Sequence, residues 1–185
     1  PDKQLRQLKG MRVHDAVIHA AGRPSRGALL FTDYGLSGIA AKEISADIAK
    51  AAKRAPVSAS LDLIPSMGER EIADFLSGLG GKCEDMLIGI LPRAVGAAVI
   101  KTAGVDSKSD TQLLGRNALL NLARTAKNFK VTFDGTKGFQ NAQVTRGGVN
   151  INEFDREPLE AKKVPGLFCA GELLDVDGGC GGFKL

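Results

Sequence analysis

The residues best suited to chemistry lie in the final stretch of the chain, Cys169 to Leu185 (CAGELLDVDGGCGGFKL). An apolar run that overlaps its start, Leu167 to Ala170, predicts a short strand. Glu172 would then follow the carboxyl end of that strand, where open α/β sheets bind ligands. Its carboxylate can accept hydrogen bonds from sugar-like hydroxyls, and Asp175 and Asp177 add two more acceptors. These residue types indicate a site for a polyhydroxylated ligand.

Glycines crowd the same stretch, at Gly178, Gly179, Gly181 and Gly182. Glycine has no Cβ and adopts positive φ without strain, so a flat ligand could approach backbone amides closely. If a helix followed, its N-terminus would face an anion or an oxygen that gains charge. A solvent-exposed loop is the alternative interpretation, and the residue types alone favour neither. With Pro1 in place of an initiator methionine, this ending predicts that the chain is a piece of a longer protein.

The sequence offers few other candidates for catalysis. It has no P-loop and no G-x-S-x-G motif, and Gly78 to Cys83 departs from the dinucleotide fingerprint, so this segment is interpreted as the end of a helix. His14 and His19 are expected to be surface or packed residues rather than bases. The three cysteines form no C-x-x-C pair, which predicts a reducing cytoplasm, no metal site and no redox role for Cys180. No catalytic residue is assigned.

Composition narrows the classes of partner. The 185 residues include 25 basic and 21 acidic side chains, a net charge of +4, and the basic residues are spread along the chain. Tryptophan is absent and tyrosine occurs once, so the aromatic platforms that bind single-stranded nucleic acid are missing. No apolar run approaches the ~20 residues that span a bilayer. We therefore predict no nucleic-acid partner and no membrane.

Hydrophobic spacing predicts the elements that would position the site. In the first third, Met11 to Ala20, Gly27 to Thr32 and Val57 to Leu63 are predicted as strands. Ile39 to Arg54 is predicted as a helix, because its apolar residues recur at helical spacing.

The middle of the chain has the spacing of short amphipathic helices. Ser66 to Glu69 fits a capping box that would start the first of them. Further helices are expected around Leu87 to Leu91, from Arg93 to Ala103, and from an N-cap at Asp110. Four short helices with brief connections predict a small bundle.

Strands are predicted again after the helices. Lys130 to Asp134 and Phe139 to Thr145 would form a hairpin around the turn at 135–138. This order predicts an α+β fold in which a helical bundle is inserted into a discontinuous, barrel-like β part. The predicted division places the β part at 1–64 with 129–145, the bundle at 65–128, and a further segment at 146–185.

Three stretches of the chain carry longer motifs: Leu30 to Gly38 (LFTDYGLSG), Phe139 to Val149 (FQNAQVTRGGV) and Val164 to Phe183 (VPGLFCAGELLDVDGGCGGF). In this order and spacing, they resemble a family of bacterial flavoproteins called NAD(FAD)-utilising dehydrogenases or aminoacetone-oxidase-like flavoproteins. The resemblance implies an FAD domain of two-dinucleotide-binding type, interrupted by a barrel-like part and a helical bundle. Residues 1–145 would be this insert, and residues 146–185 a partial FAD-binding segment.

The resemblance also implies which residues contact FAD. Glu172 would accept a hydrogen bond from the ribityl chain, while amides of a helix after Gly182 would face the isoalloxazine ring. The full set of implied cofactor-binding residues is Gly147, Gly148, Gly171, Glu172, Asp175, Asp177, Gly178, Gly181 and Gly182.

The function that the resemblance implies is an FAD-dependent oxidoreductase. Hydride would pass between flavin and a nicotinamide or an amine-like substrate, so a small-molecule substrate and NAD(P)H are the expected partners. The insert would cover the flavin and shape the substrate pocket. Because the family's G-x-G-x-x-G motif is not in this chain, we expect this polypeptide alone to be inactive and to bind no FAD. The alternatives are a non-catalytic barrel-plus-bundle binding module and a flavoprotein fold that has lost its cofactor.

Overall fold

The computed structural model describes residues 3–142, 146–176 and 178. It contains two compact units, Pro1–Thr136 and Lys137–Leu185. The α-helices and strands of the described residues all lie in the first unit, whereas the second is built from short 3₁₀ turns and isolated bridges.

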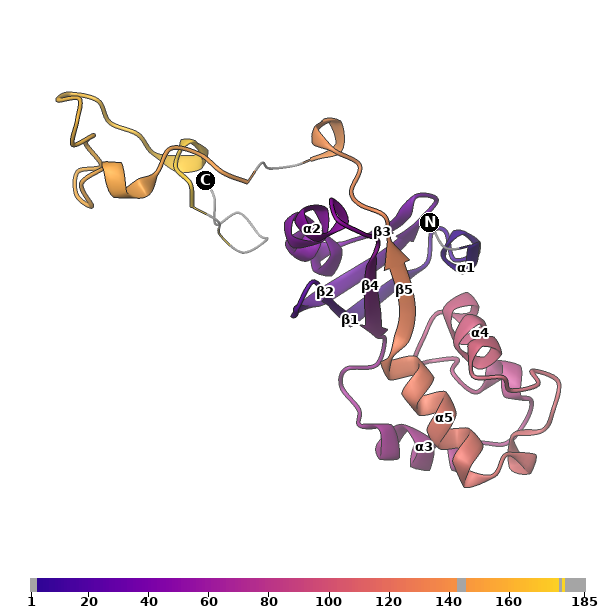
Figure 1. The fold of residues 1–185 in the computed structure, drawn as a ribbon. Helices are drawn as coiled ribbons and strands as arrows, with labels where there is room; N and C mark the ends of the chain where they lie inside the picture. The colour runs from indigo at the N-terminus through magenta and orange to yellow at the C-terminus, as the bar shows by residue number, and fades with distance from the viewer. Residues whose placement is uncertain (1–2, 143–145, 177, 179–185) are drawn as a thin grey trace. The chain divides into compact units, whose positions relative to one another are not determined.

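A single antiparallel sheet forms the centre of the first unit, with the strand order β3-β2-β1-β4-β5 (Figure 1). Its strands are β1 Arg12–Ala20, β2 Arg23–Thr32, β3 Gly35–Ser37, β4 Val57–Asp62 and β5 Phe129–Phe133. The three strands predicted in the first third are confirmed as β1, β2 and β4. In β4, Val57, Ala59 and Leu61 are buried, as a period of two predicts.

Strand β2 begins earlier than its apolar run suggests, because a tight turn joins it to β1. Ala20 pairs with Arg23, which leaves a two-residue loop. Ala21 and Gly22 both have positive φ, of 50° and 82°, as a type I′ hairpin requires. An alanine at the first of these positions is an uncommon signal, so the sequence does not reveal this turn.

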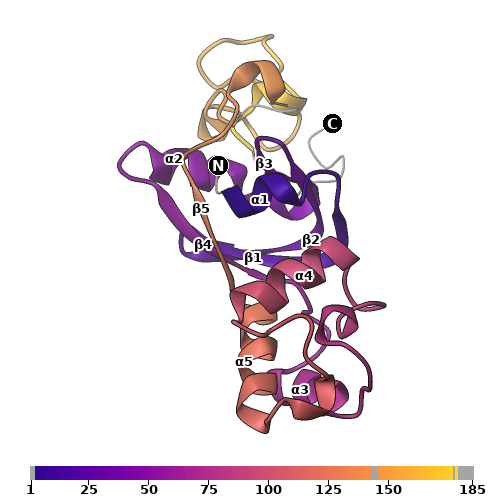
Figure 2. The ribbon, with the colours of Figure 1, turned by 90° about the vertical axis from the view of Figure 1, so that its right-hand side faces the viewer.

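Two helices, α1 Lys3–Gln7 and α2 Ile39–Ala52, cover one face of the sheet (Figure 2). α2 is the helix predicted at 39–54, and its buried apolar residues are Ala40, Ile44 and Ile48. It starts after Gly38, whose φ is +95° and whose backbone passes so close to β2 that a Cβ would lie 2.2 Å from the carbonyl oxygen of Ala28. Only glycine therefore fits at this junction.

Three further helices gather beyond the end of the sheet where β4 ends and β5 begins (Figures 1 and 2). They are α3 Glu69–Ser77, α4 Arg93–Thr102 and α5 Arg116–Lys127. The predicted Ser66–Glu69 capping box is wrong, since α3 begins after Gly68, whose amide donates to the Glu71 carboxylate at 3.2 Å. Gly78 ends α3, as predicted.

Two predicted helices of the bundle differ in the structure. No α-helix forms around Leu87 to Leu91, because Gly89 has a φ of +90°, which an α-helix does not allow. The helix expected from Asp110 begins only at Arg116, after one 3₁₀ turn. The described part of the bundle therefore contains three α-helices instead of four.

The hairpin predicted after the bundle is also wrong. Strand β5 is confirmed, but it pairs with β4, with Val131 opposite Ala59. Phe139–Asn141 is a 3₁₀ turn, and residues 143–145 lie outside the described residues. Long-range pairing with a buried strand has replaced the local pairing, because it places β5 over the core.

One apolar core joins the sheet to the helices within the first unit. A polar tie also links them at the end of β4. The Lys127 ammonium of α5 donates to the Asp62 carboxylate at 2.7 Å and to the carbonyl oxygens of Ile64 and Met67 at 3.0 and 2.8 Å. The predicted α+β fold is confirmed, while the predicted division at residues 64, 128 and 145 stays a prediction.

Candidate functional site

Two of the stretches predicted to bind cofactor meet in the second unit. The amide of Val149 donates to the carbonyl oxygen of Leu173 at 2.7 Å, and the amide of Asp175 donates to that of Val149 at 2.9 Å. This is a short parallel bridge between Val149 and Leu174. The structure thus places Gly147 and Gly148 beside the segment that contains Glu172 and Asp175.

Gly148 is fixed by this close approach. A Cβ there would lie 2.5 Å from the carbonyl oxygen of Leu173 and 2.8 Å from the amide nitrogen of Asp175. These are backbone atoms, so no side-chain rotation relieves the clash. Gly147 has a φ of +99°, but a Cβ on it would meet nothing within 4 Å. Glycine is therefore required at position 148 by lack of space and is favoured at position 147 by its backbone conformation.

The carboxylates of this segment face solvent. Gly171, with a φ of +67°, opens the 3₁₀ turn Gly171–Leu173, and Glu172, Asp175 and Gly178 are exposed. Among the described residues, neither carboxylate has a hydrogen-bond or ion-pair partner, so both are available to accept from a ligand. Asp177, Gly179, Cys180, Gly181 and Gly182 lie outside the described residues.

The strand predicted at Leu167 to Ala170 is wrong. Phe168 makes one isolated antiparallel bridge with Glu160, and Ala161 donates its amide to the carbonyl oxygen of Leu167 at 2.8 Å. Glu172 is therefore presented by a 3₁₀ turn and not by the end of a strand. In the described part of this unit, the backbone forms isolated bridges instead of a sheet.

The second unit has a very small apolar core. Its buried residues are Phe154, Ala161 and Leu174, with Cys169 packed partly against them. Eight larger apolar side chains among the described residues of the same unit are exposed: Phe139, Val149, Ile151, Val164, Leu167, Phe168, Leu173 and Val176. A core of this size contributes little burial energy, so hydrogen bonds hold much of the fold of this unit.

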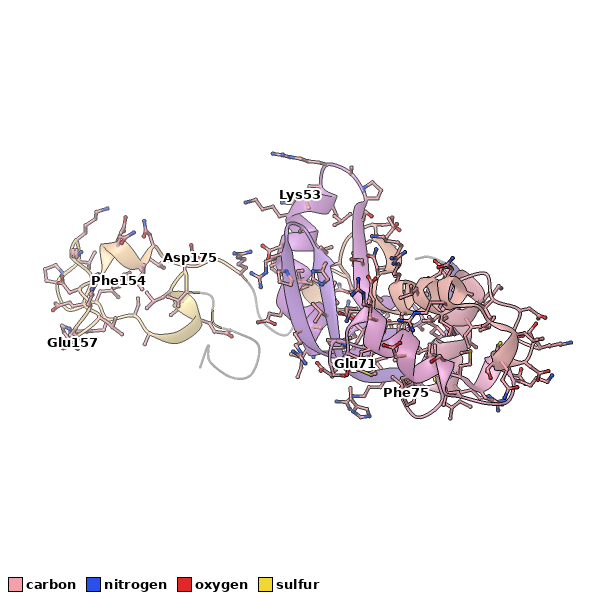
Figure 3. All side chains as sticks on the ribbon, turned by 90° about the horizontal axis from the view of Figure 1, so that it is seen from below. Lys53, Glu71, Phe75, Phe154, Glu157 and Asp175 are labelled. Atoms are coloured by element: carbon pink, nitrogen blue, oxygen red, sulfur yellow. The ribbon has the colours of Figure 1, made fainter. Side chains whose placement is uncertain are left out.

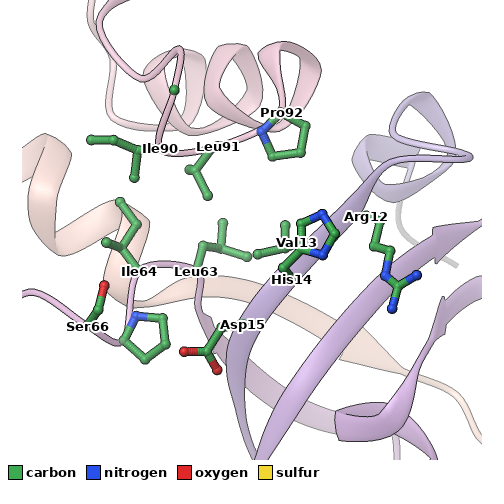
Figure 4. Close-up of a pocket in the computed structure, with 12 residues that line it drawn as sticks. Arg12, Val13, His14, Asp15, Leu63, Ile64, Ser66, Ile90, Leu91 and Pro92 are labelled. Carbon is green, nitrogen blue, oxygen red and sulfur yellow. The ribbon is translucent and has the colours of Figure 1, made fainter.

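A cavity of about 400 Å³ lies in the first unit, between the start of β1 and the helical part, which we define as residues 63–128 with α3, α4 and α5 (Figure 4). Its apolar wall is formed by Leu63, Ile64, Ile90, Leu91 and Pro92, and its polar rim by Arg12, His14, Asp15 and Ser66. The rim exists because β1 bulges between Val13 and Ala16, which exposes His14 and Asp15 on the same face.

The charged side chains of this rim give no indication of a catalytic acid or base. Two hydrogen bonds from the Arg26 guanidinium, at 2.9 and 2.7 Å, lower the pKa of Asp15 below its ordinary value. Asp15 is thus held as a paired carboxylate rather than poised as a base. His14 and His19 are both exposed on β1.

Other chemistry has little support in the part of the chain that the structure describes. No three His, Cys, Asp or Glu side chains are grouped there as metal ligands. Burial raises the pKa of the Cys83 thiol, which makes it a packing residue rather than a nucleophile. Of the described helices, none combines the length and the apolar character that crossing a bilayer requires.

The fold and site define a chain in which an α+β unit of antiparallel sheet and helices is followed by a glycine- and carboxylate-bearing segment. Residues 1–144 match the family described as the HI0933-like protein barrel and H2TH domain. The chain therefore belongs to the HI0933-like flavoprotein family, which confirms the resemblance seen in its motifs.

Three curated relatives are similar to the chain over nearly its whole length. A 3-dehydro-bile acid delta(4,6)-reductase of Clostridium scindens is 31% identical over 95% of the chain and 46% of the relative. Ribosomal RNA dihydrouridine synthases of Escherichia coli and Haemophilus influenzae are 31% and 28% identical over 99% and 100% of the chain, and 45% of each relative. The chain thus spans about half the length of these relatives.

These relatives bear on two predictions. Their names describe oxidoreductases, which agrees with the class of enzyme that the motifs imply. The prediction that nucleic acid plays no part is not supported, because two of the relatives are named for ribosomal RNA. That prediction relied on the scarcity of aromatic residues and on basic residues spread along the chain. The first bears on stacking of bases and not on contacts with phosphates, and the second describes the sequence and not the folded surface.

Proposed function

We propose that this chain is part of an FAD-dependent oxidoreductase that saturates a carbon–carbon double bond conjugated to a carbonyl group. The relatives' names support this reaction, because dihydrouridine is uridine with hydrogen added across the double bond beside a ring carbonyl. A delta(4,6)-reductase of a 3-dehydro steroid also adds hydrogen to double bonds conjugated with a ketone. This replaces an amine-like substrate with an electron-poor alkene.

The observation that carries the proposal is the pairing of Gly148–Val149 with Leu173–Asp175. It brings the two family motifs together and leaves the carboxylates of Glu172 and Asp175 exposed as hydrogen-bond acceptors. We assign these carboxylates to hydroxyl groups of FAD, with Gly147 and Gly171 providing the turns that aim them. FAD, when bound, supplies the hydride, and NAD(P)H is the proposed source of electrons.

The first unit has a supporting role in this proposal. Its extensive core lets it keep its shape as a rigid body that covers the flavin and bounds the substrate pocket. The second unit has a core of three buried apolar residues. In a protein as long as the relatives, it would therefore gain more stability than the first unit from packing against the rest of the protein.

A non-catalytic binding module is the second candidate function. The large core of the first unit favours it, because such a unit could fold without a flavin domain. In that case, a protein that contains this chain would carry no flavin, and the cavity of about 400 Å³ would be the first place to look for a ligand.

The test is a spectrum and a titration of the protein at the length of its relatives. We expect a flavin absorption band that survives gel filtration, reduction by NADH or NADPH without oxygen, and reoxidation by a steroid dienone or by uridine-containing RNA. The variant Glu172→Gln should weaken FAD binding, whereas Glu157→Gln, an exposed carboxylate elsewhere in the second unit, should not. Absence of a flavin band would reject the enzyme and leave the binding module.

A further inference from the structure

A basic patch lies at the end of α2 in the first unit, formed by Arg23, Lys50, Lys53 and Arg54. Lys50 lies in the last turn of the helix, Lys53 follows its last residue in helical backbone conformation, and Arg54 lies in the turn that comes next. All three side chains are exposed. Figure 3 shows Lys53 at the periphery of the first unit. Arg23 joins them from β2, because its guanidinium lies 3.4 Å from Asp47, one helical turn before Lys50.

The charge of this patch is not balanced locally. Asp47 is its one carboxylate, and among the described residues the side chains of Lys50, Lys53 and Arg54 have no ion-pair partner. The C-terminus of a helix attracts cations, but its partial charge is only about −0.5. The patch carries roughly three positive charges in excess of Asp47, so capping the helix does not account for it.

In the helical part of the same unit, most basic side chains are paired with a carboxylate, although Arg70, Lys101 and Lys108 have no ion-pair partner among the described residues. Four of its basic residues each lie within ion-pair distance of a carboxylate: Lys82 with Asp110, Arg93 with Asp85, Arg116 with Asp74, and Arg124 with Glu69. An unneutralised cluster of cations is therefore a local feature of the α2 end. Such a cluster suits a polyanion, whose closely spaced charges it can meet at several points.

We propose that the basic patch binds the phosphate backbone of an RNA substrate. The inference rests on the proposed function, with two relatives named for ribosomal RNA as the reason to choose RNA among polyanions. The patch has no aromatic side chain and so offers no surface on which bases stack. Its contacts hold the RNA in place without reading its sequence, and recognition of the target uridine falls to the flavin site.

Salt dependence of RNA binding tests the patch directly. Affinity of the wild-type protein for a labelled hairpin of ribosomal RNA, measured by fluorescence anisotropy, should fall steeply with salt. In the triple variant Lys50→Gln, Lys53→Gln, Arg54→Gln, the slope of log K against log[salt] should become shallower by about 2 to 3, since each lost phosphate contact removes about 0.7–0.9. Affinity at low salt should fall at least about tenfold.

A matched control removes the same charge elsewhere. Arg70→Gln, Lys101→Gln, Lys108→Gln changes three exposed cations of the helical part that have no ion-pair partner among the described residues. It should keep nearly the wild-type slope and affinity, and thermal melts should show that both variants are folded. Equal losses in both variants would mean attraction by net charge and would overturn the proposal, as would an unchanged patch variant.

Two further measurements separate this inference from the proposed function. Binding to vesicles that contain anionic lipid, lost in the patch variant while RNA binding is kept, would assign the patch to a membrane surface and overturn the proposal. In the protein at the length of its relatives, the patch variant should retain the flavin band and reduction of a small enone. If that band is absent in the wild type while RNA binding depends on the patch, the oxidoreductase proposal fails and the RNA surface stands.

Discussion

The two units of the chain are stabilised in different ways. In the first, a continuous core joins five strands to the helices, and Phe31, Leu61 and Leu122 are fully buried within it. In the second, Phe154, Ala161 and Leu174 are the buried apolar residues, and backbone bridges with charged side chains supply the remaining contacts. The first unit, with its large core, can therefore act as a rigid scaffold. The second unit, which contains the proposed FAD-binding residues, depends on few contacts for its shape.

The largest effect is expected when one phenylalanine from each unit is replaced by alanine and the two losses of stability are compared. Phe31→Ala should destabilise the first unit by about 3–5 kcal/mol, because it leaves a cavity among fully buried neighbours. Phe154→Ala removes a side chain of the same size from the second unit and should leave the main thermal transition almost unmoved. Calorimetry of both variants measures the effect. If Phe154→Ala lowered the transition as much as Phe31→Ala, the two units would not differ in the way described.

The second test compares two lysine ion pairs. Lys127 and Asp62 are 20% and 14% exposed, and the same ammonium also bonds two carbonyl oxygens, so Lys127→Met should cost about 2–3 kcal/mol. Lys163, 76% exposed beside Glu153, should tolerate methionine with a cost below about 1 kcal/mol. Urea denaturation gives both values, and a similar cost for the two variants would contradict the role of Lys127 as the tie between β4 and α5.

A third test acts on the bridge of the second unit. In Gly148→Ala, the Cβ would meet backbone atoms of Leu173 and Asp175, so the bridge should open and the amides of Val149 and Asp175 should exchange hydrogen faster. Gly147→Ala is the matched control, with positive φ but open space around the new methyl group, and it should change exchange less. Protection in the first unit should stay as in the wild type. Unchanged exchange at Asp175 would argue against the tight approach.

The smallest effect is expected from an exposed ion pair of the first unit. Because Arg26 lowers the folded-state pKa of Asp15, the pair stabilises the fold above the ordinary aspartate pKa of about 3.9, and the stabilisation is lost as the pH falls through the lower, folded value. The melting temperature of wild type should exceed that of Asp15→Asn slightly at neutral pH and match it in strong acid. A difference that persists in strong acid would show that the contribution is not the carboxylate's charge.

Much of the first unit is predictable from local pattern. The period of two in β4, the helical stripe of α2 and Gly78 at the end of α3 are all read correctly, because burial on one face imposes a spacing on the residues themselves. The predictions fail where the conformation of a single residue determines whether an element forms. Gly89 is an example, because its positive φ prevents a helix around Leu87 to Leu91. Glycine in a sequence does not state which φ it adopts.

The candidate site is less predictable from its residues. The motifs indicate which glycines and carboxylates matter, but the strand expected before Gly171 is replaced by a 3₁₀ turn and a single bridge. The basic patch is missed, although Lys50, Lys53 and Arg54 are close neighbours in the sequence. Only the place of Arg23 requires the structure, because this residue lies far along the chain and reaches the end of α2 through Asp47. Spacing in sequence reports neighbours along one element and says little about side chains on different elements.

By itself, the sequence determines the α+β class, the buried faces of β4 and α2, and the family to which the motifs belong. Those properties follow from side-chain hydrophobicity at fixed intervals and from short motifs, which need no knowledge of distant contacts. Only the tertiary structure decides that β5 pairs with β4, that Gly148 has no room for a Cβ, and that four cations share one end of α2. Each of these depends on which remote segments come together, and that choice is made by burial of the whole core rather than by any single stretch of residues.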